Sequence, residues 1–187
     1  MRVPRYGVVL GDYSGWVCSV DQKSSAPDRV RAALSAAGIA ARIEEFPSST
    51  RTAQEAADAV GTSVGQIVKS LLFLAGAQPV LALVSGANRL DPARLAELTG
   101  LPIGKADADA VRQATGYAIG GVPPTGFPMP IPTFIDRDLL PYEVVWAAAG
   151  TPRHVFPIAP NELVRITGGR VADLKPPPYP PPEGEGK

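Results

Sequence analysis

The strongest constraint on the fold of this chain is a pair of apolar segments, Ile67–Ala75 and Pro79–Ser85, separated only by Gly76-Ala77-Gln78. A connection this short joins antiparallel neighbours, because parallel strands need a crossover of roughly a dozen residues or more. The two segments are therefore predicted to form an antiparallel β-hairpin. Their nearly continuous apolar character also predicts that both faces of the hairpin are buried.

The segments on either side of the hairpin are predicted to alternate irregularly between helices and short strands. Helices are expected where a capping residue precedes apolar positions with helical spacing, at Ser25–Gly38, Thr52–Val60, Asp91–Thr99, Asp107–Thr115 and Asn161–Thr167. Strands are expected at Ala41–Phe46, Leu101–Lys105, Thr133–Ile135, Glu143–Ala148 and His154–Ile158. Because strict βαβ alternation is missing, the order predicts an α+β fold with a mixed, largely antiparallel sheet and flanking helices.

Proline and glycine set two further parts of the chain apart. Residues 116–132 read GYAIGGVPPTGFPMPIP, which cannot form a regular helix or a central strand along its whole length. Residues 175–187, KPPPYPPPEGEGK, are expected to form an extended, disordered tail that a proline-binding protein could recognise. Residues 1–22 show no periodic pattern, so we predict an N-terminal extension at 1–22, one folded domain at 23–174 and the tail.

The scarcity of cysteine and histidine limits the chemistry that this chain can perform. Cys18 and His154 are each the single residue of their type, which excludes an intramolecular disulfide and a site of several thiolates or imidazoles. We therefore expect neither a bound metal nor a cofactor. A nucleophile–histidine mechanism would have to use His154, which we interpret instead as a surface or half-packed residue. A small-molecule esterase is disfavoured because no Gly-x-Ser-x-Gly motif is present.

Charge and hydropathy restrict the partners. No run of 18 apolar residues is present, so we expect no membrane span, and the N-terminal segment lacks the long apolar region of a signal peptide. A cytoplasmic protein is expected. Lys plus Arg and Asp plus Glu number 18 each, so nucleic acid would have to be bound by a local basic patch. The candidate residues for such a patch are Arg89, Arg94, Lys105, Arg112 and Arg137.

Two features could form a ligand site. Lys69 interrupts the first apolar segment, and a lysine there needs water, or an anionic or carbonyl ligand, to offset its desolvation; a lysine snorkelling at the sheet edge is the alternative. The loop Gly120–Gly126 combines glycines, which let a ligand approach the backbone, with prolines, which stiffen it. An ordinary rigid turn has the same composition, and the loop is not a Walker A motif.

These features occur in an order and spacing that resemble the YbaK/prolyl-tRNA editing family over roughly residues 25–174. The segments that carry the resemblance are Thr50–Ala57, Gln66–Phe73, Leu81–Gly86, Ala106–Asp107, Thr115–Gly126 and Ile135–Asp136. The resemblance implies a compact domain with a partly barrel-like mixed sheet. It also implies hydrolysis of the ester between a noncognate amino acid and the 3′ end of a tRNA.

The same resemblance implies a set of site residues. It implies that Lys69 holds the substrate near its terminal ribose or phosphate, and that the backbone at Gly120 and Gly121 positions the aminoacyl group and the water. Asp136 corresponds to an aspartate of the family, and these four are the expected catalytic residues. Seven further residues are expected to bind the substrate: Thr50, Ser85, Val122, Pro123, Pro124, Thr125 and Gly126.

The predicted function is trans-editing deacylation of aminoacyl-tRNA. An aminoacyl ester is activated, so a positioned water and a stabilised oxyanion suffice without a strong base. A second, size-selective site is needed because a synthetase rejects smaller isosteres only weakly. We expect tRNA for proline carrying a small or hydroxylated amino acid, and Ser70 stands where alanine-editing members often have Asn. The alternative is a non-catalytic module of the same fold that binds the tRNA acceptor end or prolyl-tRNA synthetase.

Overall fold

The computed structural model describes residues 24–46, 50 and 52–177. Its helices are α1 (Ala26–Ala36), α2 (Ala53–Val60), α3 (Pro92–Thr99), α4 (Ala108–Thr115) and α5 (Pro160–Thr167), with 3₁₀ helices η1 (Val64–Gln66) and η2 (Arg137–Leu139). Its strands are β1 (Glu44–Glu45), β2 (Val68–Ala75), β3 (Gln78–Ser85), β4 (Ile103–Lys105), β5 (Thr133–Asp136), β6 (Val145–Ala148), β7 (His154–Ile158) and β8 (Arg170–Ala172). The predicted N-terminal extension and residues 178–187 of the predicted tail lie outside the described residues.

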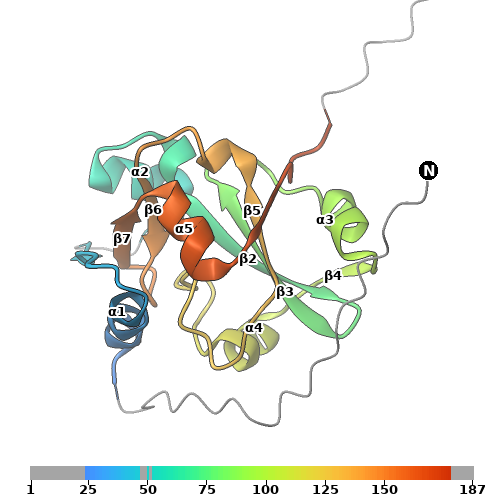
Figure 1. Ribbon diagram of the computed structural model, residues 1–187, viewed down its shortest axis with the longest axis horizontal. Coiled ribbons are helices and arrows are strands. Elements are labelled where there is room, and N and C mark those ends of the chain that lie inside the picture. The colour runs from blue at the N-terminus through green and yellow to red at the C-terminus, as the bar shows by residue number, and fades with distance from the viewer. Residues whose placement is uncertain (1–23, 47–49, 51, 178–187) are drawn as a thin grey trace, which may run out of the picture.

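The strands form two sheets (Figure 1). The larger sheet has the order β4-β2-β3-β5-β8, and the smaller has the order β1-β7-β6. Pairing is antiparallel from β4 through β3 and within the smaller sheet, but parallel from β3 through β8. A parallel bridge between Ile67 and Trp146 joins the two sheets. The predicted mixed, largely antiparallel α+β fold is confirmed.

The β2–β3 hairpin forms as predicted, with a tighter turn. Ala75 pairs with Gln78 across a two-residue loop, and the register continues to Val68 opposite Ser85. Gly76 adopts a φ of 60° at the turn, a left-handed conformation that glycine accepts without steric cost. β3 is buried on both faces from Val80 onward, whereas much of β2 is only half-buried. The prediction of two buried faces is therefore right for β3 and wrong for β2.

Three of the four predicted helix caps are confirmed, and Asp107 also caps the predicted helix that follows it. Side-chain oxygens that accept a first-turn backbone N–H are those of Ser25, Thr52, Asp91 and Asp107. The predicted cap at Asn161 is wrong, because α5 already begins at Pro160 after Ala159. Proline suits the first helical position, since its fixed φ is helical and that position needs no N–H donor. Asn161 accepts a hydrogen bond from the N–H of Glu162 inside the first turn.

The strand predictions differ from the structure mainly in extent. The predicted strand at Ala41–Phe46 shrinks to two residues, because β1 pairs with β7 only at Glu44–Val155 and Glu45–His154. β8 was not predicted, because three residues show no usable alternation and its pairing with β5 depends on a distant segment. Residues 116–132 contain neither helix nor strand, as their proline and glycine content predicts.

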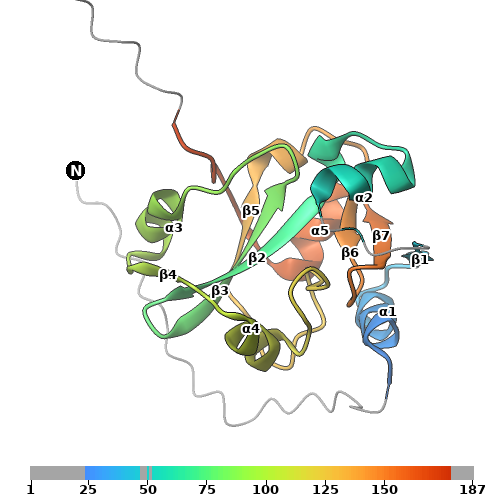
Figure 2. The ribbon, with the colours of Figure 1, turned by 180° about the vertical axis from the view of Figure 1, so that it is seen from behind.

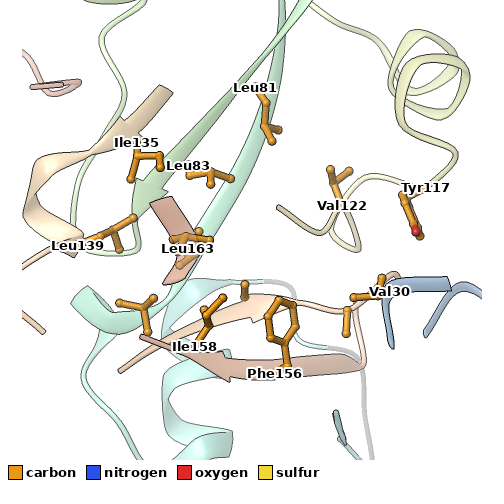
Figure 3. Packing of buried hydrophobic residues seen from close by; sticks show 14 of the residues in the cluster. Val30, Leu81, Leu83, Tyr117, Val122, Ile135, Leu139, Phe156, Ile158 and Leu163 are labelled. Carbon is orange, nitrogen blue, oxygen red and sulfur yellow. The ribbon is translucent and has the colours of Figure 1, made fainter. Parts of the chain in front are cut away.

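The main core lies between the two sheets (Figure 3). Leu83 of β3 and Ile135 of β5 lie on one side, and Phe156 and Ile158 of β7 lie on the other. Leu163 of α5 fills the space between them and is completely buried. Seen from behind, α3 lies beside β4 at one end of the molecule, and α2 lies beside β6 toward the other (Figure 2). α5 thus packs against the core between the two sheets, with Leu163 as its completely buried side chain.

Replacing Leu163 by alanine is expected to lower the free energy of unfolding by about 2–5 kcal/mol, because a buried leucine leaves a cavity when it is truncated. Leu140→Ala is the matched control, since Leu140 is 41% exposed, and it should change stability by less than about 1 kcal/mol. Urea unfolding followed by circular dichroism measures both changes. Equal losses in the two variants would contradict the placement of Leu163 in the core.

Candidate functional site

A pocket of about 280 Å³ opens at the outer edge of β2, where α2, β6 and the loop after α4 come together. Its lining includes five residues with polar side chains, which are Thr50, Thr52, Lys69, Ser70 and Thr151. The rest of its wall is mostly small or branched and apolar, and includes Ala53, Ala56, Val122 and Ala148. The pocket therefore combines a narrow apolar interior with hydroxyl groups and one cation.

The open edge of β2 gives this pocket its backbone groups. Pairing with β4 spans only Phe73–Ala75, which leaves the preceding part of that edge unpaired. Ala75 and Gln78 flank a two-residue turn, so they form a hydrogen-bonded pair. Hydrogen-bonded pairs recur at every second residue, so Phe73, Leu71 and Lys69 also direct their N–H and C=O groups toward β3. The N–H and C=O of Ser70 consequently point away from β3, toward the pocket.

Lys69 lines the pocket, and its ammonium group lies near the end of β3. Its Nζ donates hydrogen bonds to the carbonyl oxygen of Gly86, at 3.3 Å, and to that of Asn88. Burial lowers the pKa of Lys69, and the negative charge of Asp136 partly opposes that shift. An ammonium group carries three protons. Two are used within the protein, so Lys69 retains one donor for an anionic or carbonyl ligand.

Asp136 lies behind Lys69 and is not part of the pocket wall. It is completely buried, and its carboxylate accepts hydrogen bonds from the N–H of Ser85 at 3.1 Å and from Nδ2 of Asn88 at 2.8 Å. Ser85 is also buried outside the pocket lining, and its hydroxyl donates to the carbonyl oxygen of Gly65 at 2.7 Å. Both residues thus organise the chain around Lys69.

The predicted glycine-rich loop is divided between two pockets. Gly120 and Val122 line the pocket beside Lys69. Three residues of the loop line a second pocket of about 270 Å³ near the end of α5, which are Pro124, Thr125 and Gly126. Gly121 and Pro123 are buried and line neither pocket. The first part of the loop therefore contacts the Lys69 pocket, and the rest faces elsewhere.

Close backbone packing holds the first part of the loop in place. Gly120 has a φ of 86°, which favours glycine. At Gly121 a Cβ atom would lie 2.6 Å from Cα of Thr151 and 2.8 Å from the carbonyl carbon of Gly150. These distances are too short for any side chain. Glycine at position 121 therefore lets this loop pack directly against the loop that carries Thr151.

Arg29 and Tyr117 hold the segment that contains this loop, at Gly116 before it and at Gly126 at its end. The Tyr117 hydroxyl donates to the carbonyl oxygen of Gly126 at 3.2 Å. The Arg29 guanidinium lies 4.8 Å from the centre of the Tyr117 ring, and it donates to the carbonyl oxygen of Gly116 at 3.0 Å. A cation over an aromatic face is attracted by the ring quadrupole. α1 therefore holds the loop from outside the pocket.

Several pocket residues were missed by the sequence analysis. Trp146 and Ala148 line the pocket from alternate positions of β6, and period-2 alternation in that strand could have indicated a shared face. Thr151 has no such signal. Its Oγ1 lies 2.6 Å from Nδ1 of His154, whose Nε2 lies 3.9 Å from the Glu45 carboxylate. His154 is thus half-buried, as interpreted, and directly contacts the pocket wall.

The predicted basic patch lies outside the pocket. Four of its members are exposed, namely Arg89, Lys105, Arg112 and Arg137. Arg94 is half-buried and pairs with Glu97 at 3.1 Å. Across the described part of the chain, no group of three or more His, Cys, Asp or Glu side chains is arranged to hold a metal ion. No helix among residues 24–177 that the structure describes is long and apolar enough to cross a membrane.

Comparison with known proteins connects this chain and its fold to tRNA editing. Residues 47–166, more than half of the chain, match the model of a family described as the aminoacyl-tRNA editing domain. The crystal structure of a candidate trans-editing enzyme for prolyl-tRNA synthetase is 51% identical in sequence, with a TM-score of 0.79 over 82% of this chain and 99% of that chain.

Two curated relatives agree with that assignment. EbsC of Enterococcus faecalis, named as a candidate Cys-tRNA(Pro)/Cys-tRNA(Cys) deacylase, is 26% identical over 125 residues, which cover 66% of this chain and 76% of EbsC. A proline–tRNA ligase of Nitratidesulfovibrio vulgaris is 33% identical over 102 residues, 54% of this chain. That match covers only 18% of the ligase, so the likeness is to one part of a larger enzyme.

Gly121→Ala is expected to destabilise the protein by about 1–3 kcal/mol, because the added methyl group overpacks the contact with Thr151. Gly104→Ala is the control, since a Cβ there would meet its nearest atom, the Leu74 carbonyl oxygen, at 3.9 Å. It should be neutral or stabilise by up to about 1 kcal/mol, because alanine reduces the entropy of the unfolded chain. Thermal unfolding compares the two variants, and a neutral Gly121→Ala would disprove the close packing.

Proposed function

Because this chain belongs to the aminoacyl-tRNA editing domain family, we propose that it is a deacylase that hydrolyses wrongly attached amino acids from tRNA. The observation that carries the proposal is the pocket at the open edge of β2, where Lys69, Ser70 and Gly120 meet. This pocket joins a cation to free backbone groups and a rigid glycine loop. Those are the groups that an ester with a phosphate beside it requires.

The proposed reaction uses positioning rather than a strong base. Lys69 binds an oxygen of the terminal nucleotide with the donor that its two carbonyl partners leave free. The backbone N–H of Ser70 and the loop at Gly120 orient the ester carbonyl. Water adds to that carbonyl carbon, the bond to the ribose oxygen breaks, and the ribose oxygen takes up the proton that water releases. Preorganised donors stabilise the oxyanion formed on the way.

The pocket favours a small amino acid. Ala53, Ala56 and Ala148 keep its wall short, while Trp146 and Val122 limit its depth. An apolar wall alone discriminates poorly between side chains of similar size. Ser70 also lines the pocket, and its hydroxyl oxygen is buried and has no hydrogen-bond partner among the described residues. If the Ser70 side chain rotates toward the pocket when substrate binds, a substrate hydroxyl or thiol would satisfy this oxygen, which would favour serine, threonine or cysteine over alanine.

The proposed tRNA is that for proline. Three relatives support this choice: a structure titled as a trans-editing candidate for prolyl-tRNA synthetase, a deacylase candidate named for Cys-tRNA(Pro), and a proline–tRNA ligase. Prolyl-tRNA synthetase is the corresponding partner that would supply the mischarged tRNA. The tRNA body would rest on exposed basic residues outside the pocket, such as Lys105 and Arg112.

Lys69→Ala is expected to lower kcat/KM for deacylation at least about 100-fold, since it removes the only cation of the pocket among the described residues. The substrates are tRNA for proline charged with serine, threonine, alanine or cysteine. Lys105→Ala removes the same charge outside the pocket, so its kcat at saturating tRNA should be unchanged. A Lys69→Ala protein with full activity would refute the mechanism. Bound tRNA without release of any amino acid by the wild type would favour a non-catalytic binding module.

Ser70→Ala is expected to lower kcat/KM for serine- or cysteine-charged tRNA by about tenfold relative to alanine-charged tRNA, because it removes a hydrogen bond that only the former substrates can make. The folded protein should be no less stable, since the substitution removes an unsatisfied buried hydroxyl. Competition between differently charged tRNAs measures the ratio. Equal loss for all three substrates would show that the hydroxyl does not select among them.

A further inference from the structure

A connected group of polar side chains lies beside the Lys69 ammonium, outside the lining of the pocket. It consists of Asn88, Asp136, Asp138 and Lys175, from three segments that are far apart in sequence. None of these residues lines the pocket. Burying charged groups costs free energy unless they are paired and hydrogen-bonded. Each charged member of this group therefore needs such partners.

Asn88 is the centre of the group. Its main-chain carbonyl oxygen accepts a hydrogen bond from the Lys69 ammonium. Its Nδ2 donates to Oδ2 of Asp136 and to Oδ2 of Asp138, each at 2.8 Å. A side-chain amide has two N–H donors, and both have carboxylate acceptors here. The two carboxylates therefore fix the side chain of Asn88. This holds the main-chain carbonyl of Asn88 in one position relative to Lys69.

The two carboxylates are themselves fixed. Asp136 is completely buried and also accepts from the N–H groups of Ser85 and Asp138, each at 3.1 Å. Asp138 accepts from Nζ of Lys175 at 2.6 Å. That ion pair and the hydrogen bond from Asn88 lower the pKa of Asp138, and Asp138 raises the pKa of Lys175. The pair of carboxylates thus has a cation on each side, Lys69 and Lys175.

The segment that carries Lys175 is anchored next to this group. Leu174 is completely buried, and its carbonyl oxygen accepts from the N–H of Asp91 at 2.8 Å. Asp91 caps α3, the helix that follows Asn88. The same short connection between β3 and α3 therefore carries Asn88 and receives the chain after β8.

We propose that Asn88 is a positioning residue, which the two carboxylates Asp136 and Asp138 hold so that its main-chain carbonyl fixes the position of the Lys69 ammonium beside the pocket. This inference rests on the proposed function, in which Lys69 binds the substrate. Without the Asn88 amide, Asp136 and Asp138 lose their shared donor and attract the ammonium directly. Lys69 then moves toward the carboxylates and away from the substrate.

A double-mutant cycle tests the proposal in the deacylation assay. Asn88→Ala is expected to lower kcat/KM about tenfold in the wild-type background and less than about twofold in a Lys69→Ala background, since interacting residues are not additive. Asn161→Ala is the matched control, because Asn161 is the only other asparagine of the chain and lies exposed on α5. It should have no effect in either background. Equal losses from Asn88→Ala in both backgrounds would overturn the proposal.

A second measurement does not need catalytic activity. The amine of Lys69 is labelled with an acylating reagent as a function of pH, and the modified peptide is quantified by mass spectrometry. We expect Asn88→Ala and the isosteric Asn88→Asp to move the labelling midpoint of Lys69 upward, because carboxylates stabilise its charged form. Lys105 in the same sample serves as the internal reference. An unchanged midpoint in folded variants would refute the role of Asn88, whereas an inactive wild type with a shifted midpoint would refute only the proposed function.

Discussion

The antiparallel pairing of β2 with β3 is the interaction on which the rest of this structure depends. The two-residue turn at Gly76 and Ala77 sets a single register, which places Lys69 opposite Val84 near the end of β3. That position brings the ammonium within reach of the carbonyls that follow the strand. A slip of one residue would turn every side chain of β2 to the opposite face, and the cation would be lost from the pocket.

The pocket exists because the pairing of β2 is incomplete on its other side. β4 pairs with that edge only near the hairpin turn, and among the described residues the small sheet pairs with this segment only through the bridge at Ile67. Backbone groups left unpaired in this way need partners. The loop at Gly120 and the alternate residues of β6 enclose the open edge without pairing with it. An unpaired strand edge thereby offers a candidate ligand site with its own backbone donors and acceptors.

A group of charged and polar side chains lies around the end of β3. Asp136 is completely buried and offsets part of the desolvation of Lys69. Asn88 separates the two charges, so that they interact without forming a direct ion pair. A direct pair would satisfy the ammonium within the protein and leave little attraction for a substrate. In the proposed arrangement, the neutral amide keeps the Lys69 ammonium available for an anionic group.

The sequence by itself determined the local elements and the family. The caps at Ser25, Thr52, Asp91 and Asp107 and the hairpin turn are encoded within a few consecutive residues, so they could be predicted from spacing alone. The ordered motifs likewise identified the family, and four of the predicted site residues line one pocket, namely Thr50, Lys69, Gly120 and Val122. Only the tertiary structure decided that Ser85 and Asp136 lie behind the pocket, and that Pro124, Thr125 and Gly126 face a different one. It also added Trp146 and Thr151 to the wall, because a pocket is formed by segments whose contacts span many tens of residues and leave no periodic trace in the chain.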